Sequence, residues 1–326
     1  MTTTRVLTGD RPTGPLHLGH YFGSLQNRVR LQDDGADVFV LVADYQVLTD
    51  RDTAERLDDY VIGMVLDYLA IGIDPGRATI FAHSAVPALN QLLLPFLSLV
   101  SVPELNRNPT VKDEIAHSRQ SSVSGLMFSY PAHQAADILF CKATLVPVGK
   151  DQLPHLEVTR LIARRFNERY GRTFPEPEAM LSRAPLLLGT DGTKMSKSRG
   201  NAIALRATAD ETARLIKGAK TDGQRHVSYD PAGRPEVSSL VLLAALCLDR
   251  DPVAVAAEIG DGGAALLKRV VTEAVNERFA PVRARRAALA ADPGYARQVL
   301  RDGCGRTRAL ATATLEEVRD AMGMRY

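Results

Sequence analysis

The chain has 326 residues, of which 45% are hydrophobic and 24% are charged, with 40 Lys and Arg against 38 Asp and Glu. This length and composition fit a globular protein of about two domains, and they exclude disordered, collagen-like and fibrous classes. The net charge of +2 does not by itself indicate a nucleic-acid partner.

Cys141, Cys247 and Cys304 are far apart and form no C-x-x-C pair, which argues against a zinc ribbon, a redox motif or a disulfide framework. The N-terminus has no apolar signal region, and no run approaches the ~20 apolar residues that a membrane-spanning helix needs. We therefore expect a cytoplasmic protein with no membrane association.

Through the first half of the sequence, short β-branched runs alternate with helical periodicity. This order is typical of an α/β fold, here a Rossmann-like doubly wound parallel sheet. Pro131 is expected to begin one of the helices. The expected strands span residues 5–8, 38–43, 79–82 and 144–148, and the expected helices begin near Leu18 and span 53–70, 132–140 and 153–170.

After the Gly-, Lys- and Ser-rich segment 189–201, the strand signals become few. We therefore place a domain boundary near residue 200, with an α/β domain at 1–200 and an all-helical domain at 201–326. The helices expected in the second domain span residues 208–218, 237–247, 263–291 and 306–322.

The first motif is PTGPLHLGH, from Pro12 to His20, which follows the first strand and opens the first helix. A Gly-rich turn at this place lets the backbone approach a phosphate, and the helix N-terminus adds N–H groups and a positive dipole. His17 and His20 are three residues apart on one side of the helix, where each can donate to a phosphate oxygen. A metal pair is disfavoured because no third ligand lies nearby in the sequence.

The second motif is KMSKS, from Lys194 to Ser198, which follows the Gly-rich segment 189–192. Two lysines on a mobile loop can close over a triphosphate and neutralise the charge that moves onto pyrophosphate as it leaves. A lone K-x-x-K would indicate a basic surface loop. The H-x-G-H motif about 175 residues earlier makes chance co-occurrence remote.

With these two motifs, the chain resembles the class I aminoacyl-tRNA synthetases and, within them, the tryptophanyl-tRNA synthetase family. The match covers residues 5 to about 225, and the helical remainder is similar mainly in length. The further segments that carry it are GDRPTG (9–14), ADYQ (43–46), GIDP (72–75), AADIL (135–139), VPVGKDQLPH (146–155) and RFNERYG (165–171).

The resemblance implies that the enzyme activates L-tryptophan with ATP and Mg²⁺ and transfers it to tRNA(Trp), acting as a homodimer. It implies that loop 189–201 closes over ATP, with Gly189, Gly192 and Gly200 as hinges. The implied catalytic residues are His17, His20, Lys194 and Lys197. The implied ATP-binding residues are Arg11, Pro12, Thr13, Gly19, His20, Gly149, Lys150, Asp151, Lys194, Met195, Ser196, Lys197 and Ser198.

Asp137 is the implied specificity residue, because indole presents one N–H donor and no acceptor. A buried carboxylate facing that N–H forms a charge-assisted hydrogen bond, and an analogue without the donor leaves the anion unpaired. The other implied tryptophan-binding residues are Gln152, Tyr130, Gln134 and Gln46.

The chain departs from the family pattern at several of these positions. His20 stands where many members have Asn, and Lys150 stands where Glu is frequent. The pairs His133-Gln134 and Tyr45-Gln46 replace Leu-Met and Gln-His. These changes affect the packing of the amino-acid pocket and not the chemistry.

Three other functions stay open from the sequence. A tyrosyl-tRNA synthetase has the same fold, but its phenol substrate needs a partner that both donates and accepts. A small nucleotidyltransferase shares H-x-G-H but lacks KMSKS and a helical tRNA domain. A catalytically silent paralogue would act as a binding protein, against which both intact motifs argue.

Arginine is concentrated near the C-terminus, with eight residues between Arg278 and Arg308 against only Asp292 and Asp302. A solvated helical face is the simpler interpretation of such a run. In a tRNA-charging enzyme we expect it to contact phosphates, with Arg283, Arg285 and Arg286 as the residues to test.

Overall fold

The computed structural model describes residues 4–49, 56–112, 124–149, 152–181 and 186–326. Its centre is a five-stranded parallel sheet of order β3-β2-β1-β4-β5. The chain adds β2 and β3 on one side of β1, then β4 and β5 on the other, which creates a switch point between β1 and β4. The strands are β1 (Arg5–Asp10), β2 (Asp37–Val42), β3 (Ala78–Ala82), β4 (Leu145–Val148) and β5 (Glu178–Leu181).

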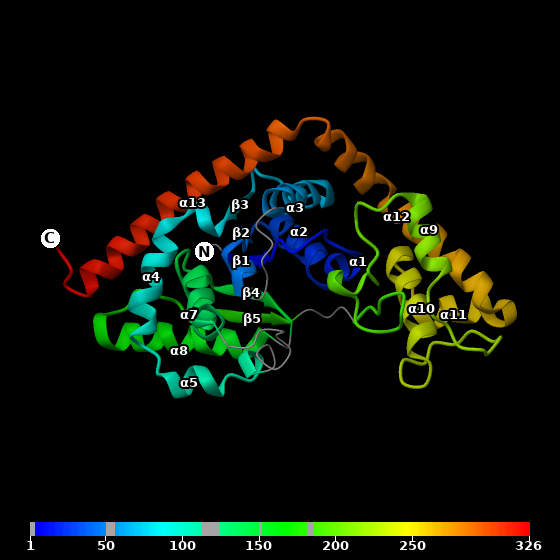
Figure 1. Cartoon of the computed structure of the whole chain (residues 1–326), viewed down its shortest axis with the longest axis horizontal. Coiled ribbons are helices and arrows are strands. Elements are labelled where there is room, and N and C mark those ends of the chain that lie inside the picture. Colours follow the sequence, from blue (N-terminus) through cyan, green and yellow to red (C-terminus); the bar gives the residue numbers. More distant parts are fainter. Residues whose placement is uncertain (1–3, 50–55, 113–123, 150–151, 182–185) are drawn as a thin grey trace.

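The sheet forms the core because its strands are apolar on both faces, as expected when helices cover both sides. In β2, Val38, Val40 and Val42 have no exposed surface, and all five residues of β3 are buried. The helices that cover the sheet include α3 (Leu57–Ile71), α4 (Pro87–Leu97), α5 (Val102–Arg107), α7 (Gly125–Leu139) and α8 (Leu153–Tyr170) (Figure 1). The predicted α/β class and parallel sheet are confirmed.

The first helical segment is not one regular helix. It consists of α1 (Leu18–His20), a π-helical turn (Tyr21–Leu25) and α2 (Gln26–Asp33). Such π turns are frequent at functional sites. This one directly follows His20, so the irregular backbone lies beside the first motif.

Several expected elements begin elsewhere in the structure. Helix α7 begins at Gly125, where the Ser124 hydroxyl caps it by accepting from the Met127 N–H at 3.1 Å, and Pro131 lies inside it. The prediction that Pro131 begins the helix is therefore wrong. Proline loses one backbone hydrogen bond inside a helix, and the burial of this stretch of α7 offsets that loss. The sequence patterns also missed β5, α4 and α5.

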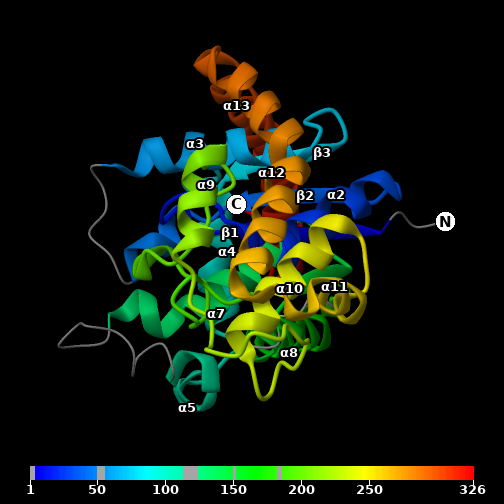
Figure 2. The same cartoon turned by 90° about the vertical axis from the view of Figure 1, so that its right-hand side faces the viewer.

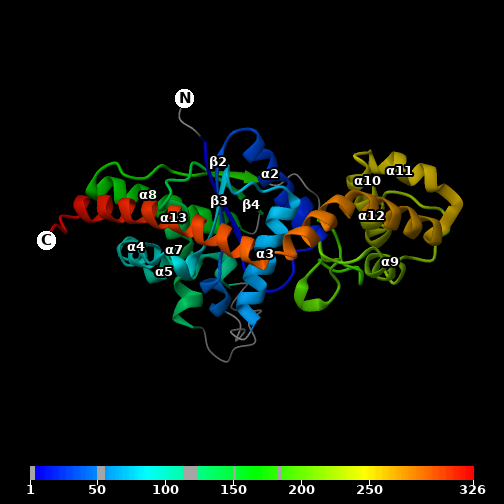
Figure 3. The same ribbon diagram turned by 90° about the horizontal axis from the view of Figure 1, so that it is seen from above.

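The second half is helical, as predicted, with α9 (Ala209–Lys217), α10 (Pro235–Leu248), α11 (Pro252–Ile259) and α12 (Gly263–Ala290) gathered at one end of the molecule (Figure 2). The last helix, α13 (Pro293–Ala321), begins earlier than the expected residue 306 and runs back over the sheet (Figure 3). Gly303 packs so closely on β3 that a Cβ there would lie 1.8 Å from the carbonyl oxygen of Ile80. The boundary at residue 200 stays a prediction, but α13 lies on the catalytic half.

Several arginines of the cluster join the two halves of the chain. Arg285 donates to the carbonyl of Ala70 at 2.7 Å, and Arg286 pairs with the buried Asp67 at 2.6 Å. Arg283 donates to Asn276 and Thr212. Arg297, Arg306 and Arg308 likewise reach Asp58, the carbonyls of Pro75 and Ala78, and the carbonyl of Ala85.

Arg283, Arg285 and Arg286 thus use some of their donors within the chain, because α12 packs against α3 and α9. The expectation that they contact tRNA phosphates stays a prediction. Sequence periodicity reveals that a face is basic, but not which surface that face meets.

Candidate active site

A cavity of about 460 Å³ opens at the carboxyl ends of β1 and β4, at the switch point of the sheet. Eight of the predicted site residues line it, drawn from the strand ends, the first helix and α7. They are Arg11, His20, Gln46, Tyr130, Gln134, Asp137, Gly149 and Gln152. We call the part around Gln46, Tyr130, Gln134 and Asp137 the Asp137 region, and the part around Arg11 and His20 the His20 region.

In the His20 region, the two motif histidines stack with ring centroids 3.6 Å apart. The backbone N–H of His17 donates to Nδ1 of His20 at 3.2 Å, so the neutral ring carries its proton on Nε2. Burial, together with Lys197, lowers the pKa of His17 to about 3 and that of His20 to about 4. Both rings are therefore neutral hydrogen-bond donors at physiological pH.

The KMSKS segment lies against this helix although it is far away in the sequence. The Leu18 N–H donates to the carbonyl of Ile203 at 3.0 Å, and the Leu205 N–H donates to the carbonyl of Leu16 at 2.9 Å. A Cβ on Gly19 would lie 3.4 Å from Sδ of Met195, and one on Gly14 would lie 3.5 Å from Cδ of Lys197. The structure thus brings the two predicted motifs together.

Asn201 organises the KMSKS loop. The sequence showed only that this residue ends the segment 189–201 and did not reveal its role. Its Oδ1 accepts from the Ser196 N–H at 2.8 Å, while Nδ2 donates to Asp191 at 2.8 Å and to the carbonyl of Lys194 at 3.2 Å. A Cβ on Gly189 would lie 2.3 Å from Cγ of Asn201, so only glycine permits this packing. The loop is a hydrogen-bonded unit built around a buried amide.

In the Asp137 region, α7 presents a carboxylate that is 1% exposed yet lines the cavity. Nε2 of Gln46 donates to Oδ2 of Asp137 at 2.8 Å, and Nδ1 of His83 forms an ion pair with Oδ1 at 2.6 Å. Burial by itself would lower the pKa of His83, but the Asp137 carboxylate raises it above its ordinary value. Gln46 and His83 thus hold this buried carboxylate from two sides, and it can accept one more donor.

Tyr130 forms another wall of this region. Its hydroxyl makes a short hydrogen bond with Nε2 of His155, and Nδ2 of Asn108 donates to Nδ1 of the same ring at 3.2 Å. His155 belongs to the VPVGKDQLPH segment and is wholly buried. The aromatic wall is therefore fixed from behind by a histidine that the sequence analysis did not assign.

Beneath the His20 region lies a buried ion pair that sequence reasoning also missed. Arg28 donates to both carboxylate oxygens of Asp10 at 2.6 and 3.2 Å, and the Tyr68 hydroxyl donates to Oδ2 at 2.7 Å. Burial alone would raise the pKa of Asp10, but the Arg28 guanidinium holds it well below its usual range. In the sequence, only the position of Asp10 at the end of the first strand indicated that this carboxylate could belong to the site.

Of the remaining predicted residues that the structure describes, none lines the cavity. Pro12 and Thr13 lie in the turn before α1, and Lys194, Met195, Ser196, Lys197 and Ser198 lie in the loop beside it. Lys150 and Asp151 lie outside the described residues. The roles of all these residues stay predictions.

Comparison with known proteins agrees with this geometry. The family model "tRNA synthetases class I (W and Y)" matches residues 1–280. The tryptophan–tRNA ligase of Treponema pallidum is 44% identical over 98% of this chain and 97% of its own length. That of Clostridium longisporum is 41% identical over 98% of this chain and 97% of its own length.

Solved structures give the same result. Tryptophanyl-tRNA synthetase from Campylobacter jejuni, complexed with ADP and tryptophan, matches with a TM-score of 0.85 and 30% identity over 98% of this chain and all of that one. The enzyme from Mycoplasma pneumoniae matches with a TM-score of 0.84 and 25% identity over 99% and 98% of the two chains. The resemblance inferred from the motifs is confirmed, and the chain belongs to the family of class I tRNA synthetases for tryptophan and tyrosine.

Proposed function

We propose that this enzyme activates L-tryptophan with ATP, releasing pyrophosphate, and then transfers the tryptophanyl group to the 3′ end of tRNA(Trp). The observation that best supports the choice of tryptophan is Asp137, a buried carboxylate on the cavity wall. It accepts hydrogen bonds and donates none, which suits the single N–H of indole. A phenol, the side chain of tyrosine, requires a partner that also donates.

In the first step, a carboxylate oxygen of tryptophan attacks the α-phosphorus of ATP, and the bond to the β-phosphate oxygen breaks. Pyrophosphate leaves and tryptophanyl-adenylate remains. In the second step, a ribose hydroxyl of the terminal tRNA adenosine attacks the carbonyl carbon, and AMP leaves. Neither step requires a protein nucleophile, so catalysis depends on positioning and electrostatic stabilisation.

We assign each side chain a role from the donor group that it offers. Neutral His20 donates from Nε2 to a phosphate oxygen, and Gln152 reaches the amino-acid ammonium. The ammonium groups of Lys194 and Lys197 neutralise the charge that develops on pyrophosphate. Of these groups, the lysines stand on the loop built around Asn201, and the others line the cavity.

Mg²⁺ enters this proposal as part of the nucleotide. Two carboxylates line the described cavity, Asp10 and Asp137, and both are paired with cations of the protein. The described cavity wall therefore offers the ion no uncommitted carboxylate. We propose that the phosphates and water hold it, as Mg²⁺ prefers.

We also propose that the enzyme is a cytoplasmic homodimer that binds tRNA(Trp) through its helical half. Leu94 on α4 is 72% exposed and Val102 on α5 is 62% exposed, which is unusual for large apolar side chains unless another surface covers them. These helices follow each other in the chain and lie on the sheet half, away from α9–α12 (Figure 1). No helix among the described residues is long and apolar enough to cross a membrane.

Amino-acid-dependent ATP–pyrophosphate exchange tests the proposed activity, with tryptophan, tyrosine and no amino acid as the three arms. We expect exchange with tryptophan alone. Exchange with tyrosine but not tryptophan would overturn the specificity, and no exchange in any arm would favour the silent paralogue. Light scattering of wild-type and Leu94→Glu/Val102→Glu protein tests the dimer, because the double variant should be a monomer.

A further inference from the structure

The carboxylate of Asp137 has a partner that does not reach the cavity. Gln46, which donates to Oδ2, lines the cavity wall, whereas His83 lies behind Asp137 and has no exposed surface. His83 contacts Oδ1 of Asp137 at 2.6 Å. It can therefore influence a ligand in the cavity only through Asp137.

The position of His83 is fixed from the neighbouring strand. His83 begins a short 3-10 helix, His83–Ala85, directly after β3. Asp44, which follows β2, accepts from the Ser84 N–H at 2.9 Å on Oδ1, and the Ser84 hydroxyl donates to its Oδ2. Because β2 and β3 are adjacent and parallel, their carboxyl ends hold this turn in one conformation.

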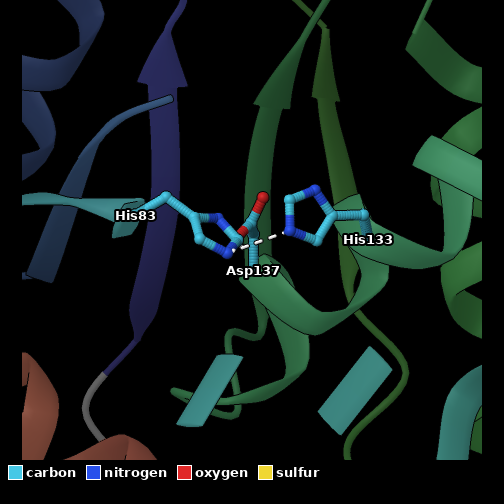
Figure 4. Close-up of side chains that lie close together, drawn as sticks. All are labelled: His83, His133 and Asp137. Atoms are coloured by element: carbon cyan, nitrogen blue, oxygen red, sulfur yellow. Dashed lines mark hydrogen bonds and ion pairs between the residues drawn. The ribbon is translucent and has the colours of Figure 1, made fainter. Parts of the chain in front are cut away.

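The other nitrogen of His83 is also engaged. Its Nε2 lies 2.9 Å from Nε2 of His133 on α7 and 3.2 Å from Oδ1 of Asn90 on α4. Figure 4 shows the two imidazole rings pointing toward each other from different elements. Burial lowers the pKa of His133, while Asp137 and Asp44 raise that of His83 against the effect of its burial. His83 thus places Nδ1 beside the Asp137 carboxylate and Nε2 beside His133 and Asn90.

A bound metal ion is the other chemistry that these side chains could support. His83, His133 and Asp137 offer ligand atoms within 4.8 Å of one another. However, two nitrogen ligands of a tetrahedral zinc ion at ~2.0–2.1 Å would lie about 3.3 Å apart. The observed separation of 2.9 Å between the two Nε2 atoms is that of a hydrogen bond.

We propose that His83 is a positioning residue for substrate recognition: its Nδ1, 2.6 Å from Oδ1, holds the Asp137 carboxylate in the orientation that accepts the ring N–H of the amino acid. This inference depends on the proposed tryptophan activity. It assigns the selectivity for a ring N–H to a pair of side chains on two elements, α7 and the turn after β3, and not to Asp137 alone. Without His83, the buried carboxylate loses a partner that orients it and offsets its desolvation.

The test compares tryptophan with an analogue that has sulfur in place of the ring N–H, 3-(1-benzothiophen-3-yl)-L-alanine, in pyrophosphate exchange at neutral pH. For His83→Ala, we expect kcat/KM for tryptophan to fall about 30-fold and that for the analogue less than about 3-fold. The KM for ATP should not change. His83→Asn keeps an N–H directed at Oδ1 and should restore most of the discrimination.

The matched control is His226→Ala, which removes an exposed histidine that is also paired with an aspartate, Asp261, at 2.8 Å. It should leave both substrates unaffected. Equal losses for tryptophan and the analogue in His83→Ala would overturn the proposal, because a structural defect affects both. One equivalent of metal in the purified protein, whose removal by a chelator abolishes tryptophan activation, would also overturn it. Failure of the proposed function would look different, since the wild-type enzyme would then show no tryptophan-dependent exchange.

Discussion

The two regions of the site carry their charged groups in different surroundings. In the Asp137 region, the carboxylate is buried and paired with side chains on strand ends and helices. Beside the His20 region, the lysines stand on a loop that lies outside the cavity. Asp137 is 1% exposed and is held by His83 and Gln46. Lys194 is exposed, and the loop meets the first helix through backbone pairs and packing at Gly14 and Gly19.

This difference matches two tasks. Selecting an amino acid requires a carboxylate that is already in place, because reorganising a buried charge would weaken discrimination. Neutralising a leaving pyrophosphate requires cations that approach when the nucleotide is bound. The first part of the site is fixed by buried contacts, and we expect the second to close around its substrate.

The largest effect should come from removing the buried acceptor. Asp137→Ala should lower kcat/KM for tryptophan by roughly 10²–10³-fold, because the ring N–H loses a charge-assisted bond and the buried His83 loses its partner. The KM for ATP should stay within about 2-fold, since we propose that ATP binds in the His20 region. The matched control is the exposed Asp261→Ala. An equal loss of ATP affinity would contradict the separation of the two regions.

Removing a lysine of the KMSKS loop should affect kcat and not the KM for tryptophan. Lys197→Ala should lower kcat for adenylate formation by about 10²-fold and leave the KM for tryptophan unchanged, because Lys197 acts on charge that develops in the transition state. Single-turnover measurement of adenylate formation checks this. Lys220→Ala serves as control, since Lys220 is exposed and paired with Glu236. A higher KM for tryptophan in Lys197→Ala would contradict this prediction, because it would indicate that the lysine contacts the amino acid and not the phosphates.

A smaller loss of kcat is expected when Asn201, which organises the KMSKS loop, is replaced. Asn201→Ala removes the amide that joins Ser196, Asp191 and Lys194, so the loop should spend less time in the competent arrangement. We expect a loss in kcat of about tenfold, the equivalent of ~1.4 kcal/mol. Amide hydrogen exchange should become faster in residues 190–200 and stay unchanged in β2. Unchanged exchange in that loop would contradict the role given to Asn201.

The two regions also differ in how far the sequence could predict them. The H-x-G-H and KMSKS motifs are local, so their residues and their meeting could be inferred before the structure was known. His83, Asn90 and His155 could not be inferred, because each acts through a contact between elements that are distant in the sequence. The arginine run shows the same limit, since its composition suggested tRNA while its partners are Asp67, Asp58 and backbone carbonyls.

The strands and long helices were predicted because continuous apolar runs and helical periodicity are strong local signals. The short elements were missed where that signal is weak. Strand β5 is four residues long and only partly buried, and α5 is six residues long. Helix α7 was started too late because a proline is usually read as a helix boundary, and only the tertiary packing of its buried face allows one inside.

The smallest expected effect is on stability, and it concerns the histidines alone. The folded pKa values of about 3 for His17 and about 4 for His20 lie below the value of 6.5 for an unfolded histidine. The unfolded chain therefore binds more protons in this range, so the free energy of unfolding is complete above pH 6.5 and decreases as the pH falls toward 4. At pH 5.5, one unit below the unfolded value, we expect a loss of about 1.4 kcal/mol per histidine. Urea unfolding of the wild type and of His20→Asn should show a shallower pH dependence in the variant. The Asn side chain is the one found at this position in many family members, so the variant should fold. Equal pH slopes in the two proteins would mean that His20 binds its proton at the same pH in the folded and the unfolded chain. The burial of the His20 ring would then have no effect on its pKa, which would contradict the environment that the structure gives it.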